Sequence, residues 1–184
     1  MVQAGFSHEM RNALRNMVGH RFIAYEYGED ASSNTAYGNV RLNTDNGDVE
    51  IRCEERPLPF FGETEDVACF ACRQVRPEEP FVPAVITSTN RAMVDDRIDA
   101  VEILTDQINV NHNEYQIEID VAVIFHCEHC TIMFSRGIWF SEVITISFDD
   151  DYEKVFPMQK IIESWSNEGE YDVRVQRSHS SLDL

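Results

Sequence analysis

The sequence predicts an α+β protein that is mainly antiparallel β-sheet, with about ten short strands, a meander-type second half and one helix near each end. Three observations favour this class. Apolar residues alternate from Tyr115 to Phe125, the dipeptide Asn46-Gly47 is typical of a tight hairpin turn, and apolar residues recur at helical spacing near both ends of the chain. The 184 residues and 43% hydrophobic content are enough for one compact core.

The first expected element is a helix that follows Ser7. The Ser7 side chain can cap it, Glu9 suits its positive end, and Phe6 can pack against its first turn. Gly19 tolerates the left-handed conformation that ends many helices, so we expect the helical segment to stop there.

Short extended segments are expected after this helix. They lie at residues 20–27, 37–43, 48–54, 66–75 and 83–89. Asp45 to Asp48 is the predicted hairpin turn. Arg56 to Gly62 and Arg76 to Pro80 each carry two prolines, which fix the backbone, so both are expected to be rigid connectors.

The second half is more regular. Strands are expected at Ile98 to Leu104 and Ile108 to Val110, interrupted by Asp106-Gln107, and then at Tyr115 to Phe125, 131–135 and 138–148. In the strand from Tyr115, the six alternate residues to Phe125 are expected to share one buried face. Pro157 is expected to begin a helix with one apolar stripe ending at Trp165.

These elements predict a single compact α+β domain over residues 1–173. Two packed β-rich halves, about 1–78 and 81–173, are the alternative, since the second proline connector lies between them. Residues 174–184 show no periodicity and are expected to be a disordered tail.

Charge is the clearest feature of the composition. There are 15 Lys and Arg against 33 Asp and Glu, so the net charge is −18. This charge repels nucleic acid and anionic membrane surfaces. No long apolar stretch and no signal peptide at Met1 to Ser7 are visible, so a soluble, cytoplasmic protein is expected.

The acidic excess is concentrated where the sequence has no Lys or Arg, between Arg97 and Arg136. We interpret this segment as an acidic face that docks a basic protein partner; a solvated surface kept charged for solubility is the other interpretation. The candidate partner-binding residues are Asp99, Glu102, Asp106, Glu114, Glu118, Asp120 and Glu128.

Two Cys-x-x-Cys pairs suggest an alternative function, a zinc-stabilised regulatory or scaffolding domain. Four thiolates can hold zinc in a tetrahedron, and the candidate ligands are Cys69, Cys72, Cys127 and Cys130. The first pair lies in a predicted strand, where residues three apart point to opposite faces. The second pair flanks Glu128-His129, which can form a hairpin tip. Small buried hydrophobic thiols are the simpler interpretation of all four.

The predicted function is therefore a non-enzymatic acidic binding protein without a cofactor, for instance an inhibitor or immunity-type protein, with homo-oligomerisation left open. A small enzyme with a Cys/His site at residues 126–130 is the second alternative, because His126 and His129 flank Cys127. No phosphate-binding glycine motif or nucleophile elbow accompanies them.

Overall fold

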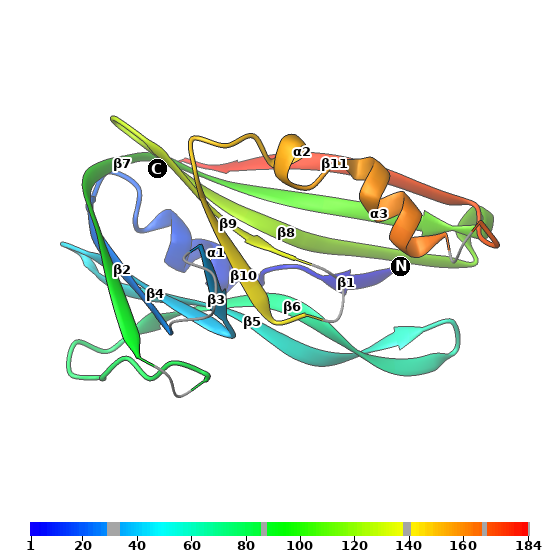
Figure 1. The fold of residues 1–184 in the computed structure, drawn as a ribbon, viewed down its shortest axis with the longest axis horizontal. Helices are drawn as coiled ribbons and strands as arrows, with labels where there is room; N and C mark the ends of the chain where they lie inside the picture. Colours follow the sequence, from blue (N-terminus) through cyan, green and yellow to red (C-terminus); the bar gives the residue numbers. More distant parts are fainter. Residues whose placement is uncertain (29–33, 86–87, 138–140, 167–168, 184) are drawn as a thin grey trace.

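The computed structural model describes residues 1–28, 34–85, 88–137, 141–166 and 169–183. It is mostly antiparallel β-sheet, as predicted, with eleven strands and three short α-helices in the described residues (Figure 1). The strands are β1 (Val2–Ala4), β2 (Arg21–Gly28), β3 (Thr35–Tyr37), β4 (Asn39–Thr44), β5 (Gly47–Phe60), β6 (Glu63–Val75), β7 (Thr89–Val110), β8 (Tyr115–Cys127), β9 (Thr131–Arg136), β10 (Val143–Phe148) and β11 (Val173–Leu182). The helices are α1 (His8–Arg15), α2 (Tyr152–Val155), α3 (Met158–Trp165) and the 3₁₀ turn η1 (Asn111–Asn113).

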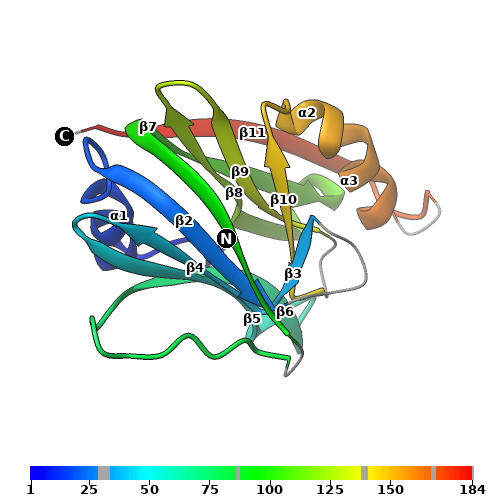
Figure 2. The ribbon, with the colours of Figure 1, turned by 60° about the vertical axis from the view of Figure 1, so that its left-hand side comes forward.

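Nine of the eleven described strands form one continuous path in the order β3-β10-β9-β8-β7-β2-β4-β5-β6, and off this path β1 pairs with β8 and β11 with β7. Strand β7 bends and takes part in two sheets, which face each other across the core (Figure 2). Sheet A contains β3, β10, β9, β8, the second part of β7, β11 and β1, whereas sheet B contains the first part of β7 with β2, β4, β5 and β6. A first apolar core, which includes Phe22, Phe70 and Phe125, draws on both sheets.

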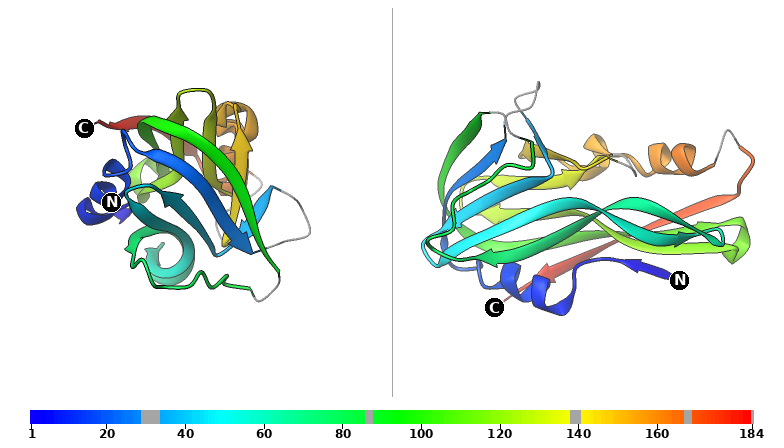
Figure 3. Two further views of the ribbon diagram at one scale, coloured as in Figure 1. Left: turned by 90° about the vertical axis from the view of Figure 1, so that its left-hand side faces the viewer. Right: turned by 90° about the horizontal axis from the view of Figure 1, so that it is seen from below.

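Helix α1 begins where the sequence predicts. The Ser7 hydroxyl accepts a hydrogen bond from the backbone N–H of Met10, which satisfies one of the free donors of the first turn. The helix ends at Arg15, before Gly19, which adopts a positive φ of 84°. Helix α1 contacts β6 and β11, and both views of Figure 3 show it close to the C-terminus.

The first proline-rich segment is not a connector, which corrects the prediction. The Asp45-Asn46 turn joins β4 to β5 as expected, but β5 continues through Pro57 and Pro59 to Phe60 and pairs with β6 along its whole length. The Cys53 N–H still donates to the Gly38 carbonyl at 2.8 Å, but beyond it no strand among the described residues pairs with the other side of β5. Proline is tolerated on such an edge because its missing N–H has no partner to lose. The result is a long twisted hairpin, with its tip at Phe61-Gly62.

Strand β7 also differs from the prediction. The expected break at Asp106-Gln107 is absent, and one 22-residue strand runs from Thr89 to Val110. The strand expected at 83–89 is not formed: residues 83–85 are irregular, and 86–87 lie outside the described residues. The second proline connector, Arg76 to Pro80, lies in the irregular segment between β6 and β7.

Strand β8 is the predicted long strand, but its buried residues face two cores. A bulge at the pairing of Leu104 with Ala122 and of Thr105 with Asp120 inserts one extra residue, Val121. Because one inserted residue reverses the alternation, Ile117 and Ile119 pack in a second core whereas Val123 and Phe125 pack in the first. The prediction of one shared face is therefore wrong beyond the bulge.

The C-terminal part contains more structure than expected. Helix α3 follows Pro157 as predicted, and α2 precedes it. The predicted disordered tail is wrong, because β11 pairs with β7 from Val173 to Leu182. The second core lies where α2, α3 and the β5–β6 hairpin cover one face of β7 and β8. Of the predicted strand at 138–148, only Val143–Phe148 forms β10; residues 141 and 142 are irregular, and 138–140 lie outside the described residues.

Candidate functional site

A cavity of about 710 Å³ lies between α3, the tip of the β5–β6 hairpin and strands β7, β8 and β9. Its walls are mostly apolar or aromatic, and a few charged side chains lie among them. Binding sites for small molecules commonly have this size and this composition.

The aromatic wall is assembled from distant parts of the chain. Phe61 and Trp165 line the cavity, and Tyr115, which is not among the lining residues, stacks on both of them, with 4.9 Å between ring centroids to Phe61 and 5.9 Å to Trp165. The Tyr115 hydroxyl donates a hydrogen bond of 2.9 Å to the Pro59 carbonyl oxygen, which fixes the hairpin tip against β8. Phe61 adopts a positive φ of 48° next to Gly62, so this tight tip presents the Phe61 ring to the cavity.

The charged residues of the cavity come from β7, β9 and α3. Asp106 is fully buried, and the Arg177 guanidinium of β11 donates two hydrogen bonds to its carboxylate at 2.7 and 2.9 Å. Arg177 also lies over the Tyr152 ring, 4.3 Å from its centroid. Arg136 at the end of β9 is 3% exposed, and burial lowers the pKa of its guanidinium. Lys160 lines the cavity from α3.

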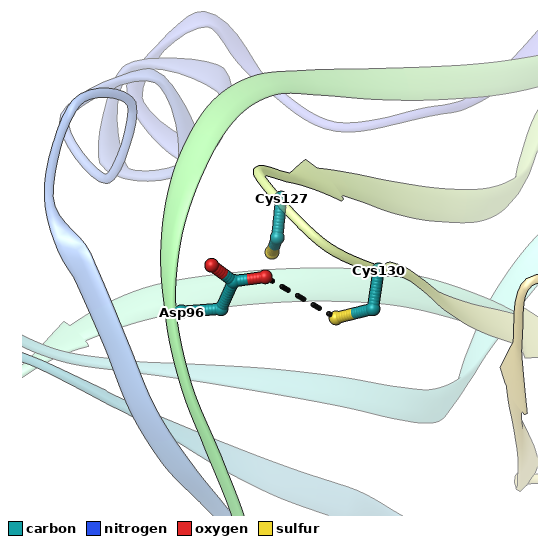
Figure 4. Close-up of side chains that lie close together, drawn as sticks. All are labelled: Asp96, Cys127 and Cys130. Carbon is teal, nitrogen blue, oxygen red and sulfur yellow. Dashed lines mark hydrogen bonds between the residues drawn. The ribbon is translucent and has the colours of Figure 1, made fainter.

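A second cluster lies away from this cavity, at the turn between β8 and β9 (Figure 4). One ligand atom from each of Asp96, Cys127 and Cys130 lies within 4.8 Å of the other two. The Asp96 carboxylate accepts hydrogen bonds from the backbone N–H of His129 at 2.8 Å and from the His129 ring at 3.1 Å. The ring hydrogen bond contributes most to holding the pKa of Asp96 at about 2, and it raises the pKa of His129.

The predicted partner-binding carboxylates do not form one exposed face. Asp106 and Asp120 are fully buried and paired with Arg177 and Arg11, so they cannot contact a partner. The segment itself has no Lys or Arg, but the fold brings Arg11 and Arg177 from other parts of the chain to pair with these two carboxylates.

The other carboxylates have different surroundings. Glu102 accepts hydrogen bonds from His126 and His179, and Glu118 is half-buried. Asp99, Glu114 and Glu128 are exposed. Docking of a basic partner through these exposed residues stays a prediction.

The four predicted zinc ligands are not brought together. Cys69 packs in the second core, whereas Cys72 packs in the first and its thiol donates a hydrogen bond to the Met10 carbonyl at 3.1 Å. The opposite directions follow from their spacing on a strand. Of these four cysteines, only Cys127 and Cys130 lie in a common cluster of potential metal ligands among the described residues.

The arrangement around Cys127 does not support a nucleophile. Burial raises the pKa of the Cys127 thiol to about 12, whereas a catalytic cysteine needs a lowered pKa. The Cys127 thiol donates to the Phe125 carbonyl at 4.0 Å, and among the described residues no hydrogen bond joins it to the ring of His126 or His129.

Sequence reasoning missed both the cavity and the role of Asp96. The apolar stripe of α3 is visible in the sequence but is equally typical of a packed core.

Comparison with family models, curated proteins and solved structures finds no match to the chain. Among the described residues, no helix combines the length and apolar character needed to cross a membrane.

Proposed function

We propose that the protein is a non-enzymatic binding protein whose ligand is an apolar molecule with one anionic head group, such as a long-chain carboxylate. The observation that carries the proposal is the position of Arg136, a buried cation in the wall of a mostly apolar cavity. This proposal keeps the predicted class of binding protein and assigns it a small-molecule ligand.

Charge favours an anion in this cavity. Asp106 is the acidic residue among the lining groups, and its two oxygens are hydrogen-bonded to Arg177. Arg136 and Lys160 add two positive charges to the lining. Among the described lining residues, cations thus outnumber carboxylates by two to one, which favours an anion locally in a chain of net charge −18.

Burial strengthens this preference. Because burial disfavours the charged form of Arg136, an anion bound beside it restores part of the lost solvation. The remainder of the ligand contacts aromatic and aliphatic walls, including Phe61, Ile161 and Trp165. Burial of an alkyl chain there contributes about 0.8 kcal/mol per methylene.

The test is binding of dodecanoate, with dodecanol as the uncharged analogue of equal chain length. Trp165 lines the cavity, so its fluorescence provides a direct readout. Dodecanoate is expected to bind more tightly than dodecanol. Equal binding of the two, or tighter binding of dodecylammonium, would contradict the anionic head group, and failure of all three to bind would contradict the site.

The two lysines of the chain provide a matched pair of variants. Lys160→Gln removes one of the two positive charges that line the cavity, whereas Lys154→Gln removes an exposed charge of α2 outside the cavity lining. The first variant is expected to weaken dodecanoate binding by about two- to fivefold at low salt, and the second to leave it unchanged. Arg136→Met is expected to weaken it by about 10- to 100-fold, provided that circular dichroism shows an intact fold.

A further inference from the structure

The turn between β8 and β9 is independent of the cavity and brings together a set of side chains with different chemistry. Two thiols and one carboxylate meet there, from Cys127, Cys130 and Asp96 (Figure 4). Cys127 and Cys130 are half-buried, so solvent can reach the cluster. Asp96 is 9% exposed and comes from a different strand, β7.

Backbone hydrogen bonds fix the two cysteines in the turn. The N–H of Cys127 donates to the carbonyl of Cys130 at 2.8 Å, which closes a tight hairpin with both cysteines at its base. The N–H of Glu128 donates to the Arg97 carbonyl at 3.0 Å. The turn is thus hydrogen-bonded to the bend of β7.

A bulge in β7 supplies the carboxylate. The pairing shifts between Phe22 with Asp96 and Ala24 with Met93, and Asp95 inside this bulge adopts a positive φ of 59°. Bulges redirect the side chains that follow them. Here Asp96 points to the cysteines of the hairpin, with one oxygen 3.7 Å from the Cys130 sulfur.

The geometry points to a zinc site formed by Cys127, Cys130 and Asp96, with water in the fourth position. Zinc binds thiolates at about 2.3 Å and carboxylate oxygens at about 2.1 Å, so tetrahedral angles place the sulfur and oxygen about 3.6 Å apart. The Cys130 sulfur and the Asp96 oxygen are 3.7 Å apart before any metal is added. The two ligands therefore need almost no rearrangement.

The ligand types select the metal. Sulfur ligands favour zinc and disfavour calcium and magnesium, which prefer oxygen alone. Both thiols lose their protons when zinc binds, while Asp96 is already a carboxylate. His129 donates to the other Asp96 oxygen at 3.1 Å and orients this ligand from the outside.

The consequence is a cross-link between the β8–β9 hairpin and the bend of β7. This bend is the point where the chain passes from sheet B to sheet A. Zinc at this position would therefore stabilise the junction of the two sheets, in addition to whatever the cavity binds.

The experiment uses the full reduced chain, stripped of metal and titrated with Zn²⁺ by isothermal calorimetry, with native mass spectrometry for stoichiometry. One zinc per chain is expected. Cys127→Ser, Cys130→Ser and Asp96→Asn should each weaken binding by at least about 100-fold, because loss of a ligand exceeds the effect of losing an outer partner. Cys72→Ser removes one thiol from the other Cys-x-x-Cys pair and is the matched control, expected to bind as the wild type does.

Cobalt provides a measurement that needs no variant. Co²⁺ in place of zinc is expected to show thiolate-to-metal charge-transfer absorption with the intensity of two sulfur ligands. Absence of zinc binding, equal binding by Cys127→Ser and wild type, or an equal loss in Cys72→Ser would overturn the site. If His129→Ala lost zinc binding as completely as Cys130→Ser, His129 would itself be a ligand. That result would overturn the assignment of water to the fourth position.

Discussion

The Arg11 guanidinium donates a hydrogen bond of 3.0 Å to the Asp120 carboxylate, which is fully buried. The same carboxylate accepts from the Phe6 backbone N–H and the Thr105 hydroxyl, each at 2.6 Å. Gly5 makes this approach possible, since a Cβ atom there would lie 2.9 Å from an Asp120 oxygen. This pair ties the start of α1 to the middle of β8.

Arg11→Met is expected to lower the free energy of unfolding by about 3 kcal/mol, because it leaves a buried carboxylate without its cation. Urea denaturation measures the change. Glu114→Gln, at an exposed position, is the control and is expected to stay within about 0.5 kcal/mol of the wild type. A loss below about 1 kcal/mol for Arg11→Met would show that the other two hydrogen bonds are sufficient.

Ile117→Ala is expected to cost about 2–4 kcal/mol, because Ile117 is fully buried in the second core and its truncation leaves a cavity. Glu118→Ala changes the neighbouring residue on the opposite face of β8 and serves as the control, with an expected change within about 0.5 kcal/mol. Equal stability of the two variants in urea would contradict the register of this strand.

The features that local sequence encodes were predicted well. The Ser7 cap, the Asn46-Gly47 turn and the alternation that begins at Tyr115 each depend on residues a few positions apart, so the sequence alone identifies them. The end of the shared face at Val121 could not be predicted, because a bulge depends on the register with β7.

Long-range partners explain the main errors. The sequence predicts a break between two strands at Asp106-Gln107, but Asp106 lies inside β7. Its carboxylate is paired with Arg177, which lies 71 positions away along the chain. Arg177 belongs to β11, whose polar sequence resembles a disordered tail until β7 supplies its hydrogen bonds. The Asp96 cluster was equally hidden, since the bulge at Asp95 places this residue beside the cysteines.

The Glu102 carboxylate is expected to make stability depend on acid pH. Burial raises its pKa, but hydrogen bonds from His126 and His179 outweigh this effect, so the pKa in the folded state is lowered. A lowered pKa contributes stability above the unfolded value, and this contribution disappears as the pH falls through the folded value. Urea unfolding from about pH 6 to pH 3 should therefore show a smaller acid loss in Glu102→Gln than in the wild type. The same acid loss in both proteins would contradict the role of this carboxylate.

Thiol labelling separates the five cysteines by burial. In the metal-free protein Cys127 and Cys130 are half-buried, whereas Cys53, Cys69 and Cys72 are buried. Iodoacetamide followed by peptide mass spectrometry is expected to label the first two and to leave the other three unmodified until the protein unfolds. Burial raises the pKa of Cys127 to about 12 and also raises that of Cys130, so thiolate is scarce at neutral pH. Because only thiolate reacts, labelling should accelerate about tenfold per pH unit from about pH 7 to pH 9 without levelling off. A plateau near neutral pH would contradict the raised pKa values, and rapid labelling of Cys69 or Cys72 in the folded protein would contradict their burial.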